Sequence, residues 1–156
     1  MFIAKFYYNS IYTLKRIALR LKGAKVGKGV KLYGKIIVKY PNKLSIGDFS
    51  TINDGVLLNC KGGIIVGKYC RLSSNSQLHS TGLTIDEFPR VHKSKKIILE
   101  DNVWLGSSSV VTMGVVIGKN STVGALSLVN KNIEALSFYG GIPAKKIKDI
   151  ILKDNE

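Results

Sequence analysis

The sequence predicts an all-β fold, a parallel β-helix whose short strands coil around an aliphatic core. Aliphatic residues recur at every sixth position in runs that start at Val26, Ile46 and Val66, and again from Leu99 to Val129. The first three starts are 20 residues apart, and glycine follows the aliphatic residue at each of them. A step of six matches neither the period of an α-helix nor the alternation of an amphipathic strand. It fits strands of about four residues joined by turns.

The six-residue steps also define the predicted core. Three steps close one triangular turn of about 18 residues, and successive turns stack about 4.8 Å apart. We count about five coils between Val26 and Glu134. We expect the glycines to provide the positive φ that the bends require. The 17 step positions are Val26, Leu32, Val38, Leu44, Ile46, Ile52, Leu58, Ile64, Val66, Leu72, Leu78, Leu99, Leu105, Val111, Ile117, Val123 and Val129.

The N-terminal segment, residues 1–24, is predicted to be a basic amphipathic helix, because residues 2–22 contain neither proline nor glycine. Its apolar face is predicted to contain Ile3, Phe6, Tyr7, Leu14, Ile17, Ala18 and Leu21. Another face contains Lys5, Asn9, Tyr12, Arg16 and Arg20. Two compatible interpretations follow. The helix packs on the open first coil and hides its edge, or it lies on an anionic membrane surface through residues 1–22.

The β-helix is predicted to span residues 25–136, with one excursion at residues 80–96. Packing of a compact solenoid does not require such a loop, and loops on a rigid scaffold often carry functional side chains. The two histidines of the chain flank it, His79 at its entry and His92 near its exit. Residues 137–156 form a C-terminal segment, in which the sequence KKIKDIILK predicts a short helix that covers the last coil.

The charge balance is strongly basic, with 24 Lys and Arg against 10 Asp and Glu, a formal charge of +14. Residues 1–43 carry 11 of the basic residues and no acid, so this end attracts polyanions. Recognition motifs for nucleic acid are absent from the sequence, and its N-terminal aromatic residues fall on a helix, so we expect no nucleic-acid partner. The sequence contains no run of 18 apolar residues, so it does not predict a membrane-spanning helix. We also expect no signal peptide. Two cysteines, Cys60 and Cys70, favour free cytosolic thiols.

Three motifs in the C-terminal half carry a resemblance to a known family. They are DNVWLG at residues 101–106, IGKN at 117–120 and GIPAK at 141–145. The sequence resembles the hexapeptide-repeat acyltransferases over roughly residues 26–148, in the branch of sugar and polysaccharide O-acetyltransferases related to maltose and galactoside acetyltransferases. The resemblance implies a left-handed β-helix and a homotrimer that binds acetyl-CoA between neighbouring subunits.

The resemblance also implies an activity. It is the transfer of an acetyl group from acetyl-CoA to a hydroxyl of a sugar or of a cell-surface polysaccharide precursor. The expected location is the cytoplasm, peripheral to the inner face of the cell membrane. By matching positions, the residues expected to contact the cofactor are Trp104, Gly106, Ser107, Gly124, Ala125, Asn130, Lys131, Lys145 and Lys148. The three lysines among them suit the phosphates of CoA.

A loop histidine is the general base in this family, since imidazole titrates near working pH and an alcohol must lose its proton as it attacks. The family histidine usually follows the last aliphatic step before the loop by about four to seven residues. In this sequence His79 follows Leu78 at once, and Gly82, Leu83 and Thr84 occupy the usual zone. His79 is therefore the first candidate for the base, and His92 is the second.

Three other interpretations use the same scaffold. One is an N-acetyltransferase of an amino sugar. Another is a non-catalytic trimeric binding or scaffolding protein, which the displaced histidine favours. The third is a zinc enzyme like the γ-type carbonic anhydrases, which bind zinc through three histidines. With two histidines in the chain and no Cys/His cluster, we expect no metal.

Overall fold

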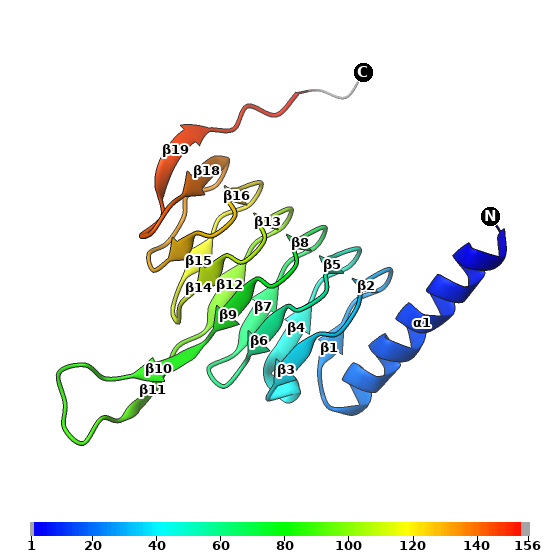
Figure 1. The fold of residues 1–156 in the computed structure, drawn as a ribbon, viewed down its shortest axis with the longest axis horizontal. Coiled ribbons are helices and arrows are strands. Elements are labelled where there is room, and N and C mark those ends of the chain that lie inside the picture. Colours follow the sequence, from blue (N-terminus) through cyan, green and yellow to red (C-terminus); the bar gives the residue numbers. More distant parts are fainter. Residues whose placement is uncertain (1, 154–156) are drawn as a thin grey trace.

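The computed structural model describes the backbone of residues 2–153 and the side chains of residues 12–153. Figure 1 shows a helix followed by a solenoid of stacked coils, with one strand in each of three sheets per coil. The helix is α1 (Phe2–Leu21). The first sheet contains β1 (Lys25–Val26), β4 (Leu44–Ile46), β7 (Ile64–Val66), β12 (Ile97–Leu99) and β15 (Val116–Ile117).

The other two sheets complete the three-sided coil. The second sheet contains β2 (Lys31–Leu32), β5 (Thr51–Ile52), β8 (Arg71–Leu72), β13 (Trp104–Leu105), β16 (Thr122–Val123), β18 (Ser137–Gly140) and β19 (Lys145–Asp149). The third sheet contains β3 (Ile37–Lys39), β6 (Leu57–Asn59), β9 (Gln77–His79), β14 (Val110–Val111) and β17 (Leu128–Val129). A short 3₁₀ turn, η1 (Pro41–Lys43), lies between β3 and β4.

The six-residue repeat places one aliphatic side chain of each strand inside the solenoid. The strands pair in parallel with their counterparts one coil away, so that Val26, Ile46 and Val66 stack on one another. All step positions are buried except Val38 in the first coil, which packs partly buried against the core. The prediction of a parallel β-helix is confirmed.

The glycines that follow the step residues have a different role from the expected one. None of Gly47, Gly67 and Gly106 has a positive φ. A Cβ on Gly47 would lie 2.5 Å from the carbonyl carbon of Gly67, in the next coil. The glycines are therefore required by the close approach of stacked backbones, and the turn bends two residues later, at Phe49 and Tyr69, where φ is positive.

Helix α1 covers the first coil, as one interpretation of the sequence expects, but it does so through the face that was predicted to be polar. Tyr12 and Leu19 are buried, and the Tyr12 ring packs edge-on against Tyr33 at 4.9 Å between centroids. Lys15 Nζ donates to the carbonyls of Leu32 (3.2 Å) and Gly34 (2.6 Å).

The physical reason is that the end of a solenoid presents backbone carbonyls without strand partners, and basic side chains can donate to them. Arg20 donates in the same way, to the carbonyl of Val26. The face predicted to be apolar does not make these contacts, because Leu14, Ile17 and Leu21 are exposed. The members of that face at Ile3, Phe6 and Tyr7 lie outside the residues whose side chains are described.

The prediction of a C-terminal helix is wrong, because residues 145–149 form strand β19. This strand runs antiparallel to β18 and covers the free edge of the second sheet. Pairing satisfies the backbone groups of β18, which a helix across the coil would leave without partners. Lys146 Nζ adds ion pairs with Glu134 and Asp149.

Residues 80–96 leave the solenoid between β9 and β12. They form a two-stranded antiparallel arm, β10 (Thr81–Leu83) and β11 (His92–Ser94), that projects from the side of the molecule (Figure 1). The arm begins at the C-terminal end of β9 in the third sheet.

Candidate active site

His79 is the last residue of β9 and stands at the base of the arm. It alternates with the buried Leu78, so its side chain points outward together with that of Gln77. His79 Nε2 donates to Gln77 Oε1 at 2.9 Å, because an amide oxygen can only accept. This contact assigns the proton to Nε2 and leaves Nδ1 with the free lone pair that a general base needs.

The surroundings of His79 keep its imidazole neutral. Partial burial lowers the pKa of His79 below its ordinary value, and the charge of Lys39 lowers it further. Lys39 and Asn59 precede His79 in the same row of the third sheet, one residue per coil. The Asn59 Oδ1 atom is buried without a hydrogen-bond partner among the described residues. The arrangement suits an imidazole that accepts a proton near neutral pH.

His92 lies farther out along the arm. It is the first residue of β11, it is exposed, and its Cα pairs with Leu83, four residues beyond His79. The structure therefore places the two histidines on different parts of the excursion. His79 stands on the rigid solenoid, whereas His92 stands on the arm.

Trp104 lies at one end of a groove of about 530 Å³ that runs along the second sheet from β2 to β13. Its ring lies half exposed between Arg71 and Thr122 of the neighbouring strands, and its Nε1 donates to Ser73 Oγ at 3.0 Å. The groove is lined by Gly29, Lys31, Tyr33, Phe49, Thr51, Asn53, Arg71, Ser73 and Trp104. Aromatic and cationic side chains thus share one open face.

The turns that follow Trp104 bring the next predicted cofactor contacts into adjacent coils. A Cβ on Gly106 would lie 2.5 Å from the backbone nitrogen of Ala125, so the turn at Gly106 and Ser107 stacks on the turn at Gly124 and Ala125. The Ser107 carbonyl accepts from Leu126 N at 2.9 Å. Among the described residues, no acceptor faces the Ser107 N–H.

The predicted phosphate contacts lie at the C-terminal end of the solenoid. Asn130 and Lys131 are exposed just after β17. Lys145 and Lys148 are exposed on β19, where Lys148 pairs with Phe138 of β18. None of these three lysines takes part in an ion pair within residues 12–153, whereas Lys146 between them is occupied by acids. Their charges remain available to an anion.

One chain brings these residues together only in part. Trp104 lies on the second sheet, and Ser107 and Ala125 lie at the corner between the second and third sheets. His79 ends a strand of the third sheet, at the corner toward the first. The histidine and the tryptophan therefore point from different faces of the prism.

Sequence reasoning missed Gln77, Asn59 and Lys39 as neighbours of His79, and Ser73 as the support of Trp104. Spacing alone carries a signal for the first three. Gln77 is two residues before His79, and Asn59 and Lys39 are one and two 20-residue coils before it. Ser73 is 31 residues from Trp104, a separation that includes the arm and so hides the coil spacing.

Other chemistry is not assembled in the described residues. Within residues 2–153, no three His, Cys, Asp or Glu side chains are grouped to hold a metal ion. Cys60 and Cys70 are free and buried, and burial raises the pKa of Cys60 to about 12 and that of Cys70 to about 11. In the same part of the chain, no helix has the length and apolar character to cross a membrane.

Comparison with known proteins identifies the family. The family model described as the hexapeptide repeat of succinyl-transferase matches residues 96–125. A protein of Escherichia coli K12 assigned to colanic acid biosynthesis as an acetyltransferase, WcaF, is 33% identical over 146 residues, which are 89% of this chain and 76% of the relative. The chain belongs to the hexapeptide-repeat acetyltransferase family.

Solved structures of hexapeptide-repeat acetyltransferases have the same fold. A maltose O-acetyltransferase from Clostridium difficile 630 superposes with a TM-score of 0.86 at 27% identity, over 90% of this chain and 77% of that one. A hexapeptide-repeat acetyltransferase from Vibrio cholerae, solved in complex with acetyl coenzyme A, has a TM-score of 0.83 at 26% identity, over 89% of this chain and 78% of that one. The resemblance stated from the motifs is confirmed.

Proposed function

We propose that this acetyltransferase moves the acetyl group of acetyl-CoA to a hydroxyl of a sugar or of a cell-surface polysaccharide precursor, with His79 as the general base. The observation that carries the proposal is the hydrogen bond from His79 Nε2 to Gln77, which leaves the Nδ1 lone pair free to accept a proton. The relatives assigned to colanic acid and maltose acetylation support a glycan acceptor.

The proposed reaction is a direct transfer. His79 Nδ1 takes the proton of the acceptor hydroxyl as its oxygen attacks the thioester carbon. The tetrahedral intermediate places negative charge on the former carbonyl oxygen, and the unpartnered Ser107 N–H is the proposed donor to it. Collapse breaks the C–S bond, and the imidazolium returns the proton to the CoA sulfur. An acetyl ester and free CoA leave.

The proposed cofactor position follows the stacked turns. Acetyl-CoA is expected to extend from Trp104 past Ser107 and Ala125, with its phosphates on Lys131, Lys145 and Lys148. On the second sheet, β13 and β19 are separated by three strand spacings, about 14 Å, so these groups span an extended molecule. Asn130 contributes an amide at the same end.

We further propose that the active unit is a homotrimer. His79 and Trp104 point from different faces of one chain. In the proposed trimer, His79 of one copy therefore faces the cofactor-binding side of its neighbour. The proposed location is the cytoplasm, peripheral to the inner face of the cell membrane, where acetyl-CoA and lipid-carried precursors are both accessible.

The test is release of CoA thiol from acetyl-CoA in the presence of a panel of sugars and amino sugars. His79→Ala is expected to lower kcat by about a hundredfold or more, with CoA affinity and oligomeric mass unchanged. His92→Ala serves as the matched control and is expected to retain turnover.

A His79→Ala variant that keeps most of its turnover would contradict the assignment of the base. Acetylation of amines alone would replace the O-acetyl proposal with N-acetyl transfer. Binding of glycans without any thiol release from acetyl-CoA would instead support the scaffolding interpretation.

A further inference from the structure

Helix α1 presents an apolar ridge to solvent on the side opposite its packed face. Leu14, Ile17 and Leu21 are 66%, 45% and 84% exposed, and with Ala18 they form an i, i+3, i+4, i+7 stripe. Tyr12 and Leu19 hold the helix to the first coil from the other side. Among the side chains of residues 12–153 the ridge therefore has no partner, and the contacts beneath it fix its orientation.

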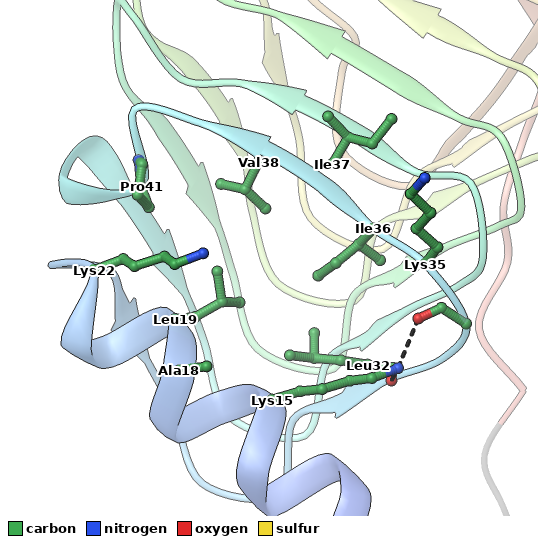
Figure 2. A pocket seen from close by; sticks show the side chains of 11 residues that line it. Lys15, Ala18, Leu19, Lys22, Leu32, Lys35, Ile36, Ile37, Val38 and Pro41 are labelled. Atoms are coloured by element: carbon green, nitrogen blue, oxygen red, sulfur yellow. Dashed lines mark hydrogen bonds between the residues drawn. The ribbon is translucent and has the colours of Figure 1, made fainter.

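A groove of about 470 Å³ continues this surface between α1 and β3. In Figure 2, Leu19 and Ala18 on the helix lie across the groove from Ile36, just before β3, and Val38 on β3. Ile37 is exposed on the same strand. Since Ala18 belongs to both the ridge and the groove wall, the two form one apolar surface.

Basic side chains outnumber acids around this surface, where the Asp54 carboxylate accepts from the Lys35 backbone N–H at 2.6 Å. Lys22 and Lys35 line the groove. Lys25, three residues after Lys22, is exposed at the start of β1. No acidic residue occurs before Asp48. Within residues 12–153, every ion pair lies beyond residue 86, so no lysine ammonium of this end is paired with a carboxylate. Lys15, by contrast, is used within the fold, by the two carbonyls to which it donates.

We propose that this N-terminal surface, formed by Leu14, Ile17, Ala18 and Leu21 with Lys22, Lys25, Lys35 and Ile37, docks on an anionic lipid bilayer. The ridge inserts its apolar side chains at the level of the headgroups, and the lysines contact lipid phosphates. Charge complementarity decides the occupant, because pairing this surface with its own copy would bring two strongly basic ends together.

Membrane association of this end is thereby assigned to particular side chains. The apolar ridge of α1 binds lipid, and the opposite face, with Tyr12 and Leu19, packs on the protein. The proposal concerns binding alone, so its outcome does not depend on acetyl transfer.

The experiment is flotation of the full chain with vesicles of phosphatidylcholine alone and of phosphatidylcholine mixed with phosphatidylglycerol, at low and high salt. The unmodified protein is expected to float only with the anionic vesicles and to dissociate as salt rises. Leu14→Gln, Ile17→Gln and Leu21→Gln combined are expected to weaken binding about tenfold or more. Lys22→Gln with Lys25→Gln is expected to weaken it about 30-fold.

Matched controls lie elsewhere on the molecule. Ile151→Gln with Leu152→Gln removes exposed apolar side chains at the C-terminal end, and Lys119→Gln with Lys153→Gln removes the same number of charges. Both are expected to bind vesicles like the unmodified protein. All of the substituted side chains are exposed, so circular dichroism and light scattering are expected to show unchanged fold and mass.

Three results would overturn the proposal. One is equal flotation with neutral and anionic vesicles, and another is no flotation with either. The third is a lower oligomeric mass for the combined Leu14, Ile17 and Leu21 variant, which would show that the ridge is covered by a second copy of the chain.

Discussion

His79 acquires its character from Gln77, two residues away on its strand, from partial burial, and from Lys39, two coils away. Gln77 accepts its Nε2 proton, burial within the row disfavours the imidazolium, and the Lys39 ammonium adds like charge. The histidine is thus held neutral and in one tautomer. The same side chain on the exposed arm, where His92 stands, has none of these contacts.

The pH dependence of kcat/KM follows from this environment. A general base acts when it is neutral, so activity is expected to fall as pH falls through the pKa of His79, at a pH below the ordinary value of about 6.5. Lys39→Gln removes the like charge and is expected to raise this pKa, which moves the acidic limb to higher pH.

The measurement is the pH–rate profile of the unmodified enzyme and of Lys39→Gln, with Lys119→Gln as a distant charge control. A limb that stays in place after Lys39→Gln would show that the titrating base is not His79.

Gly47 shows a second residue-scale effect, the packing of backbone on backbone. Gly47→Ala would place a Cβ 2.5 Å from the carbonyl carbon of Gly67 and is expected to destabilise the protein by about 1–3 kcal/mol. Gly124→Ala is the matched control, because its nearest atoms lie 3.5 Å away.

Urea unfolding of the two variants measures the difference in free energy of unfolding. Equal stabilities would mean that the coils separate easily at these positions, contrary to the close contact in the structure.

At the scale of elements, α1 and β19 close the two ends of the solenoid by different means. Helix α1 donates Lys15 and Arg20 side chains to exposed carbonyls, whereas β19 adds a strand to the second sheet. Each satisfies backbone groups that an open end would leave to water or to another molecule. Whether a helix or a strand closes an end depends on which backbone groups the terminal coil presents. The coil, and not the covering segment, determines those groups.

Deletion of residues 145–156 is expected to expose the edge of β18 and to promote self-association with a lower midpoint of thermal unfolding. Deletion of residues 151–156 keeps β19 and is expected to change neither. The helical signal in circular dichroism is expected to be the same in both, because β19 is a strand. A lower helical signal after the longer deletion alone would contradict the strand assignment.

At the scale of the whole molecule, the proposed trimer predicts that two inactive variants can complement each other. His79→Ala lacks the base, and Ala125→Trp is expected to block the exposed cofactor face. If each site takes its base from one copy and its cofactor face from the next, a site is intact only when both contributing copies carry the unmodified residue. In randomly mixed trimers this holds for about one site in four. Activity of about a quarter of the unmodified level is expected after co-expression.

Thiol release by co-purified, differently tagged variants measures this recovery, and the separately purified variants are the controls. A mixture no more active than its components would place both halves of the site in a single chain.

The periodicity of the sequence by itself determined the solenoid, because aliphatic residues at every sixth position can be buried together only by short strands that coil around a common axis. The motifs from Asp101 onward likewise determined the family. The sequence also indicated His79 and Trp104, but not that they point from different faces, since the arm interrupts the coil spacing between them.

Only the tertiary structure decided how the ends are closed and what the polar side chains touch. Periodicity reports which side chains avoid water, and it divided α1 into an apolar and a basic face without showing which face packs on the coil. The open coil instead required hydrogen-bond donors, so Lys15 and Arg20 turned inward and Leu14 outward. The glycines at Gly47 and Gly67 were read as bends for a similar reason, because the distance between neighbouring coils exists only once the chain is stacked.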